Sequence, residues 1–383
     1  MTQRSAFWAS FVRECRFLAG SPWDLALLTW MPFLLCGVIA WQLSGGVVRD
    51  LPVLLIVQDD SAISRDLALR IEAAPGLTLA GQVPDLAAAE RLVRSHEAHA
   101  ALLVPRATAE RAFEGQAPLI LYFNASYPAA AATIQREVAA VVDAANGRLA
   151  AEQIAAIAPP GSVRPAPVRA VMVMAWNAPA SQEFQLVSLL HPALLHLIFM
   201  LAVVSAFGRE LRDRSIGEWG PDLAALAGKA APYIAVFMGW ALLAILWLAG
   251  VRGWHFAGSP IVLLAGYAAM YLAYLGVSLL FVGATRTLSQ SLSMTGLFAG
   301  ASFAFAGAIF PLEQASAFAK VWGNVLPYTH FARLLARTWI AQGHGMALAG
   351  PLLVMLGIAL VTAVPGAVLY LRAARNPGSW GRR

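Results

Sequence analysis

The chain has 383 residues, of which 59% are hydrophobic and only 13% are charged, and its mean hydropathy is +0.65. Soluble globular domains carry about 25% charged residues, so this composition excludes an ordinary soluble fold. The formal net charge is +6, but the basic residues flank hydrophobic segments and do not form one patch, which argues against nucleic-acid binding. Cys15 and Cys36 are the only cysteines, so no disulfide framework is expected.

Six apolar stretches each approach the roughly 20 residues that cross a hydrocarbon layer of about 30 Å. The first lacks a small-residue cleavage site, so we predict a retained anchor and not a signal peptide. The fold class that we expect is an all-α transmembrane bundle of six helices with a periplasmic α/β domain inserted between helices 1 and 2. The stretches are Leu25–Leu43, Phe184–Phe207, Ala230–Gly250, Ile261–Gly283, Ser291–Phe310 and Ala347–Leu371.

These stretches divide the chain into a series of predicted segments. In chain order we expect a cytoplasmic amphipathic helix at 1–22, transmembrane helix 1 at 23–44, the periplasmic domain at 45–183, transmembrane helices 2–6 at 184–371 and a cytoplasmic tail at 372–383. Within 184–371 we expect a cytoplasmic loop at 208–229 and an outer, re-entrant-like segment at 311–345.

Orientation follows from the excess of Lys and Arg in short cytoplasmic loops. With both termini in the cytoplasm, the inner segments hold most of the basic residues outside the long insert, and the outer segments hold only Arg252, Lys320, Arg333 and Arg337. We therefore predict a multi-pass membrane protein with both termini in the cytoplasm and an insert that is periplasmic or extracellular. The inner basic residues are Arg4, Arg13, Arg16, Arg209, Arg212, Arg214, Lys229, Arg286, Arg372, Arg375, Arg382 and Arg383.

The insert alternates strand and helix patterns, which favours a parallel or mixed sheet. Strands are predicted at Pro52–Val57, Leu77–Ala80, Ala100–Val104 and Leu119–Phe123. Helices are predicted between and after them, with Ser61 as an N-cap, at Ser61–Ala73, Asp85–Ser95, Thr108–Glu114 and Ala129–Ile157.

The sequence offers only weak candidates for a catalytic, ligand-binding or metal-binding site. Asp59, Asp60 and Ser61 follow the first strand, where ligands of such sheets often bind, but a capped turn explains them better. His96 and His99 lack a third ligand at zinc spacing, and His191 and His196, five residues apart on one helix, do not face the same side. We expect a protein that is not an enzyme, with no catalytic residue, no bound metal and no cofactor of its own.

The loop after the second apolar stretch carries dense charge of both signs. Glu210 and Arg214 are four residues apart, the spacing of an ion pair on a helix face. Gly228-Lys229-Ala230 resembles the end of a phosphate-binding loop, but Leu223 stands where the first glycine belongs and Ala230 replaces Ser/Thr. The loop is therefore either a solvated connector or a docking segment for a soluble partner, without a nucleotide site.

Three stretches together resemble the permease subunits of ABC-2-type transporters. Phe11–Leu25 is similar to the family's amphipathic N-terminal helix, with Gly20-Ser21-Pro22 at its break. The loop from Arg209, with Gly228-Lys229 and Pro232-Tyr233 after it, is similar to the family's coupling segment and its continuation into the third span. Phe310-Pro311-Leu312, Leu326–His330 and Gly343 are similar to the outer segment between the last two spans.

The resemblance implies a permease that pairs with a second permease and binds separate cytoplasmic ABC ATPase subunits, which hold ATP and Mg²⁺. It implies export of a hydrophobic or lipid-like substrate or drug, and a periplasmic adaptor as a further partner beside membrane lipid. It also implies the bacterial inner membrane as the location. The coupling loop would then contain Arg209, Glu210, Arg212, Asp213, Gly217, Glu218 and Trp219, and the outer segment or gate would contain Pro311, Pro327, Tyr328 and His330.

Gly296, Gly300 and Gly307 give the fifth stretch a small face for close helix packing, so this stretch is the candidate dimer seam or substrate path. Two other classes stay open. A secondary transporter would need intramembrane carboxylates and inverted repeats, neither of which is evident in the sequence. A receptor or scaffold acting through its outer domain would not need the coupling loop.

Overall fold

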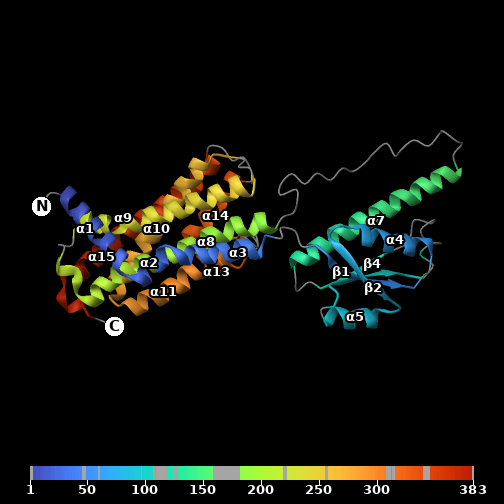
Figure 1. Ribbon diagram of the computed structural model, residues 1–383, viewed down its shortest axis with the longest axis horizontal. Coiled ribbons are helices and arrows are strands. Elements are labelled where there is room, and N and C mark those ends of the chain that lie inside the picture. The colour runs from blue at the N-terminus through green and yellow to red at the C-terminus, as the bar shows by residue number, and fades with distance from the viewer. Residues whose placement is uncertain are drawn as a thin grey trace. The chain divides into compact units, whose positions relative to one another are not determined.

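The computed structural model describes residues 3–44, 49–58, 61–95, 97–106, 108, 119–124, 128–157, 182–218, 222–254, 258–307, 312, 315–339 and 346–381. The chain divides into two compact units (Figure 1). One unit combines Met1–Ser44 with Ala175–Arg383, and the other is Gly45–Met174. The second unit is thus inserted in sequence between the first apolar helix and the remaining ones.

The first unit is helical throughout its described part. Most of its helices are apolar, and η2 is a π-helix, whose turn is wider than that of an α-helix. Its elements are α1 (Gln3–Gly20), α2 (Pro22–Leu28), α3 (Trp30–Gln42), α8 (Gln182–Asp213), η1 (Ser215–Glu218), α9 (Leu223–Leu246), η2 (Trp247–Val251), α10 (Pro260–Thr285), α11 (Leu288–Gly300), α12 (Ser302–Phe305), α13 (Ala317–Val325), α14 (Pro327–Trp339), α15 (Met346–Arg375) and η4 (Pro377–Ser379).

Among the described residues, 5 helical segments are long and apolar enough to cross a membrane. The predicted fifth stretch, Ser291–Phe310, is not one of them; its helix is divided into α11 and α12 at Ala301, and residues 308–310 lie outside the described part of the chain. The count of six spans therefore stays a prediction. The five segments are Pro22–Gln42, Leu186–Asp213, Leu223–Val251, Pro260–Thr285 and Ala347–Arg375.

Glycines bring α10 and α15 into close contact. A Cβ atom at Gly276 would lie 2.4 Å from Thr362 Oγ1, and one at Gly283 would lie 2.6 Å from the backbone nitrogen of Tyr370. Small residues allow this kind of backbone approach between apolar helices. Gly276 and Gly283 of α10 thus meet Thr362 and Tyr370 of α15 in the same order along the sequence, so the two helices run parallel. The chain between them must therefore return along the bundle.

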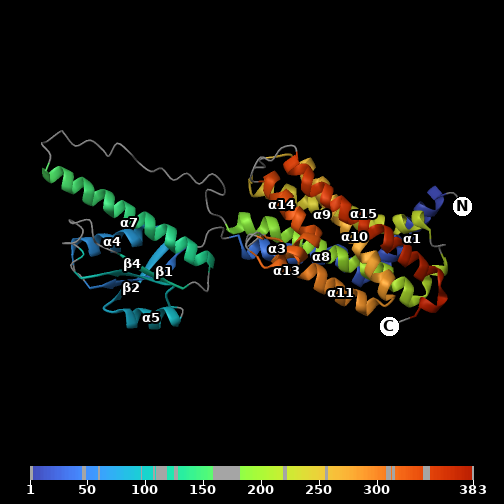
Figure 2. The ribbon, with the colours of Figure 1, turned by 180° about the vertical axis from the view of Figure 1, so that it is seen from behind.

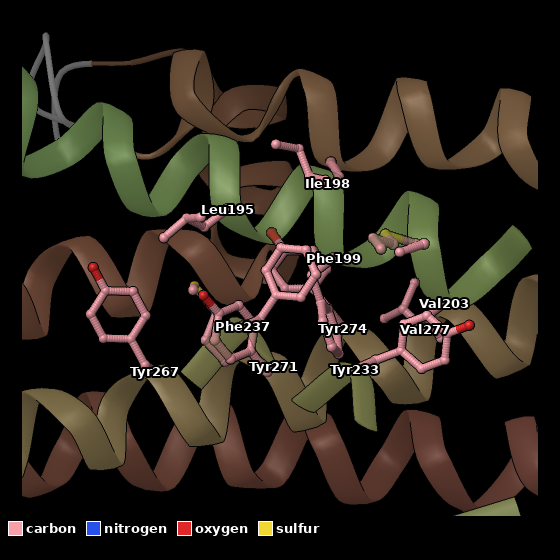
Figure 3. Packing of buried hydrophobic residues seen from close by; sticks show 14 of the residues in the cluster. Leu195, Ile198, Phe199, Val203, Tyr233, Phe237, Tyr267, Tyr271, Tyr274 and Val277 are labelled. Atoms are coloured by element: carbon pink, nitrogen blue, oxygen red, sulfur yellow. The ribbon is translucent and has the colours of Figure 1, made fainter. Parts of the chain in front are cut away.

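Aromatic side chains fill the centre of the helical unit (Figure 3). Phe199 of α8, Phe237 of α9 and Tyr271 of α10 are fully buried and contact one another, with ring centroids 4.9 to 6.0 Å apart. Tyr274 stacks on His196 at 4.5 Å. Rigid aromatic packing of this kind fixes α8, α9 and α10 as one block.

The second unit is a mixed α/β sheet in the strand order β2-β1-β3-β4. Its first three strands are parallel and β4 is antiparallel to β3. Helices α4 and α7 cover one face and α5 covers the other, as Figure 1 shows. The elements are β1 (Leu51–Val57), α4 (Ala62–Ala73), β2 (Leu77–Val83), α5 (Leu86–Arg94), β3 (Ala100–Val104), β4 (Ile120–Phe123) and α7 (Pro128–Ile157).

Local sequence explains these elements. Ser61 caps α4, where the Ser64 backbone N–H donates to its Oγ and the Ser64 side chain completes a capping box. Asp85 caps α5 by accepting a hydrogen bond from the Ala88 backbone N–H at 2.7 Å. The β1 strand is apolar on both faces because helices cover both sides of the sheet. Asp59, Asp60 and His96 lie outside the described residues, as does most of the helix expected at Thr108–Glu114.

Candidate functional site

Ionisable side chains collect at one end of the helical unit, where α8 changes from apolar to charged residues. Arg209 and Glu210 follow the buried Phe207, and their own exposures are only 9% and 3%. Charged residues are almost never this buried unless they are paired. The sequence placed both residues in a cytoplasmic loop, whereas the structure places them in the last turns of α8 with their side chains in the bundle interior.

Glu14 of α1 is the first centre of this buried ion network. One carboxylate oxygen accepts hydrogen bonds from Arg209 Nη2 at 3.0 Å and from the Tyr233 hydroxyl at 2.7 Å. The other carboxylate oxygen pairs with Lys229 Nζ. Three helices, α1, α8 and α9, therefore meet at a single carboxylate.

Glu210 is the second centre. Its Oε1 pairs with Arg13 Nη2 at 2.6 Å and with Lys229 Nζ at 2.9 Å. Its Oε2 accepts a hydrogen bond from the Tyr370 hydroxyl at 3.3 Å. Lys229 is 0% exposed and lies between the two carboxylates, so it joins both centres, and Tyr370 adds α15 to the network.

Arg209 extends the network to α2. Its Nη1 donates to Asp24 at 3.0 Å while its Nη2 donates to Glu14. The guanidinium also lies over the Phe17 ring, 3.4 Å from the centroid, a cation–π contact. The planar guanidinium suits this role because its donors form a rigid fork.

The network balances its charges. The carboxylates of Glu14, Glu210 and Asp24 meet the cations of Arg13, Arg209 and Lys229. Burial raises the pKa of the Glu14 carboxyl, but the attraction of Lys229 and Arg209 outweighs it, so that this pKa lies below its usual 4.5. Glu14 is therefore ionised at neutral pH, and the cluster is held by pairs of full charges.

Gly228 brings α1 against α9. A Cβ atom at this position would lie 2.2 Å from the carbonyl oxygen of Phe7, a distance that no side chain tolerates. The absence of a side chain at Gly228 therefore lets the backbone of α1 reach α9 and places Glu14 beside Lys229. This geometry explains the adjacent glycine and lysine that the sequence presents.

The other predicted coupling residues lie nearer the surface. Arg212 and Asp213 pair with each other at 2.7 Å, and both side chains are exposed. Arg214 follows α8 with a left-handed φ of 61°, so the helical spacing expected for Glu210 and Arg214 ends before it. The backbone of Gly217 and Glu218 lies in η1, but nothing is described of the Glu218 side chain, and Trp219 is outside the described residues.

The C-terminal residues adjoin the same end of α8. The Gly381 backbone N–H donates to the Leu211 carbonyl at 2.9 Å, and Figure 2 shows both chain termini at this end of the helical unit. The end of α8, the start of α9, α1 and the C-terminal segment thus form one surface.

Within the predicted outer segment the structure describes the helices α13 and α14, and the break between them lies at Leu326–Pro327. The Tyr328 hydroxyl donates to the Leu189 carbonyl at 2.7 Å, which ties α14 to the first part of α8. His330 Nε2 lies 2.9 Å from the Asn324 carbonyl. Pro311 is outside the described residues, so its expected role in a gate stays a prediction.

The three glycines of the fifth stretch lie in different surroundings. Cβ atoms at Gly296 and Gly300 would meet nothing within 4 Å, so both face open space on α11. Gly307 has a φ of 72°, and a Cβ atom there would lie 2.9 Å from Leu312. Gly296 and Gly300 thus share an open face, whereas Gly307 serves a turn.

Sequence reasoning did not single out Glu14, Asp24, Tyr233 or Tyr370 as site residues. The sequence shows that ionisable residues border the apolar helices, but this pattern does not indicate which of these side chains contact one another. No group of three metal-ligating side chains is present among the described residues. The ion pairs and hydrogen bonds of the network link α1, α2, α8, α9 and α15 to one another.

Comparison with known proteins places most of the chain in a family model. The family model described as "ABC-2 family transporter protein" matches residues 22–367, which is most of the chain. No curated protein and no solved structure was found to match.

Proposed function

The chain belongs to the ABC-2 family of transporter proteins, and from this premise we propose that it is the membrane-spanning permease of an ATP-driven exporter. The family supports a membrane subunit of an ABC transporter that works with ABC ATPase subunits. The substrate moves outward and is hydrophobic or lipid-like, because few fixed charges lie within the apolar helices. ATP and Mg²⁺ bind to the separate ATPase subunits.

The buried ion network is the observation that carries this proposal. A force from an ATPase must pass from the cytoplasmic surface into the transmembrane helices. Lys229 and Arg209 link α8 and α9 to α1, and Tyr370 links them to α15. A push on the surface at the end of α8 therefore moves several helices together.

The coupling loop has two parts in this proposal. Arg212 and Asp213, with the residues up to 222, form the outward part that contacts the ATPase. Arg209 and Glu210 form the inward part, which transmits the movement and does not touch the partner. In this proposal the coupling loop is therefore not one docking segment. It consists of a surface that contacts the ATPase and a buried network that transmits the movement.

The remaining elements have roles that the family suggests. A second permease packs against the open face of α11 at Gly296 and Gly300, where small residues permit close approach. The α/β unit lies on the outer side of the inner membrane, contacts a periplasmic adaptor or gates release, and performs no catalysis. Both termini are cytoplasmic.

Co-purification from the native host's membranes tests the proposal. Wild-type protein in mild detergent should carry ATPase activity, and Asp213→Arg should lose it while melting at the wild-type temperature. Glu90→Arg, on the exposed surface of α5, is the matched control and should retain the activity. If no ATPase accompanies the wild type, the permease proposal fails, and a receptor or a secondary transporter becomes the better explanation.

A further inference from the structure

A groove of about 420 Å³ lies between α3, α8 and α9, away from the ion network. This volume falls within the roughly 300–1,000 Å³ range of small-molecule sites. The three helices that line the groove belong to segments that can cross a membrane. Its lining residues are Phe33, Cys36, Gly37, Ala40, Trp41, Ser44, His191, Leu195, Trp240, Leu243, Ala244, Trp247 and Arg252.

Aromatic and aliphatic side chains make up most of the groove wall. Phe33 and Trp41 of α3 are 66% and 77% exposed, so this wall is open to the side. Trp240 is fixed by its Nε1–H, which donates to the Leu28 carbonyl at 2.7 Å. Trp247 begins the π-helix η2, and such wide turns occur frequently at functional sites. The wall therefore suits a flexible hydrocarbon chain.

The groove also has polar groups. Arg252 follows η2 directly, at the end of the α9 span, and Ser44 follows α3. His191 is 4% exposed, and its Nε2 lies 3.1 Å from the Cys36 carbonyl. That contact makes Nε2 the donor, which leaves Nδ1 as an acceptor. In the described part of the chain this buried Nδ1 has no hydrogen-bond partner.

We propose that this groove binds one anionic phospholipid of the membrane. An acyl chain fills the apolar wall, the phosphate lies against Arg252, and a headgroup hydroxyl donates to His191 Nδ1. Basic pockets between transmembrane helices on the cytoplasmic side of membranes bind the headgroups of anionic lipids, and in this proposal the same recognition by charge acts at the outer end of the α9 span. The lipid is a resident ligand and not the transported substrate, so the proposal does not depend on export.

The occupant follows from the chemistry of the lining. A peptide segment would bring backbone N–H and C=O groups into an apolar wall, where unsatisfied groups are costly. A phospholipid needs partners only at its headgroup, and Arg252 provides the opposite charge there. A zwitterionic lipid with a quaternary ammonium lacks both the net negative charge and the donor for His191.

Native mass spectrometry of the intact chain tests the proposal. The protein is purified in mild detergent, delipidated and titrated with phosphatidylglycerol, with phosphatidylcholine as the comparison lipid. The wild type should bind one phosphatidylglycerol at least about tenfold more tightly than phosphatidylcholine, a difference that corresponds to about 1.4 kcal/mol.

Two pairs of variants locate the site. Gly37→Phe should fill the groove, since a Cβ atom there meets nothing within 4 Å, and Gly357→Phe is the matched control on α15, where the same holds. The first should abolish tight binding and the second should not. Arg252→Gln should remove the preference for phosphatidylglycerol, whereas the control Arg333→Gln should keep it.

Two results would overturn the proposal. One is equal binding of both lipids by the wild type. The other is unchanged phosphatidylglycerol binding by Gly37→Phe, which would place the lipid elsewhere and leave the groove to another occupant. If Gly37→Phe fails to fold, Ala244→Phe fills the groove from the α9 wall and decides the question in the same way.

Discussion

Lys229 offers the sharpest test of the buried ion network. Its ammonium is 0% exposed and neutralises both Glu14 and Glu210. In Lys229→Met the side chain keeps a similar length but loses its charge, so the buried cluster carries one uncompensated negative charge. Removing one partner of a buried ion pair typically destabilises a protein by about 3–5 kcal/mol. We expect the lower end, because Arg209 and Arg13 still pair with the two carboxylates.

This loss is measurable as a shift in melting temperature. The helical unit, Met1–Ser44 with Ala175–Arg383, has about 250 residues, and for this size each kcal/mol lowers the melting temperature by about 2 °C. A loss of about 3 kcal/mol therefore gives a decrease of about 6 °C in detergent. Lys320 is the only other lysine of the chain and is exposed. Lys320→Met is therefore a matched control and should melt as the wild type does.

A second substitution tests the reason for the effect. Glu14→Gln in the Lys229→Met background restores the charge balance of the cluster. The double variant should therefore be more stable than the sum of the two single effects predicts, by an interaction energy of about 0.5–3 kcal/mol. If Lys229→Met melts with the Lys320→Met control, or if the two effects are simply additive, the network does not hold the helices together as argued.

Three further predictions concern stability. The pKa of the Glu14 carboxyl lies below its usual 4.5 in the folded protein. The ionised carboxylate therefore contributes its full stabilisation above pH 4.5, and this contribution declines as the pH falls through the lower pKa of the folded state. Thermal melts from about pH 6 to about pH 3 should show this loss of stability in the wild type and a smaller loss in Glu14→Gln. Gly228→Ala should destabilise by about 1–3 kcal/mol through overpacking against the α1 backbone, whereas Gly239→Ala, where a Cβ atom meets nothing within 4 Å, should not lower the melting temperature. Ile71→Ala should weaken the α/β unit by about 2–5 kcal/mol, seen as faster limited proteolysis within Gly45–Met174, and Leu69→Ala, which is 66% exposed there, should leave the rate unchanged.

Local patterns in the sequence predicted the α/β unit well. The apolar run at Pro52–Val57 and the Ser61 cap both depend on neighbouring residues, and the structure has β1 and α4 at these positions. The mixed sheet follows from the same alternation. Whether this unit lies in the periplasm depends on the membrane and stays a prediction.

Long-range contacts were not predictable in the same way. Glu14 is separated from Arg209 by 195 positions and from Lys229 by 215, so no local spacing relates them. We predicted the pair of Glu210 with Arg214 from helix periodicity. However, α8 ends at Asp213, and the buried Glu210 carboxylate pairs with Arg13 instead.

The fifth apolar stretch shows a second limit. Hydropathy sums the transfer free energies of side chains and contains no information on where a backbone turns. Hydropathy therefore did not indicate that the helix within Ser291–Phe310 divides at Ala301 or that Gly307 adopts a positive φ. That this stretch crosses the membrane stays a prediction.

The use of arginine almost everywhere in the chain has a practical consequence for labelling. Besides its amino terminus, the chain offers amine-reactive reagents only Lys229 and Lys320. In the folded protein the Lys229 side chain is 0% exposed, so of the two lysines such a reagent should modify only Lys320. Modification of Lys229 would then mark those moments when α1 separates from α9, which makes this lysine a native reporter of helix opening during the working cycle.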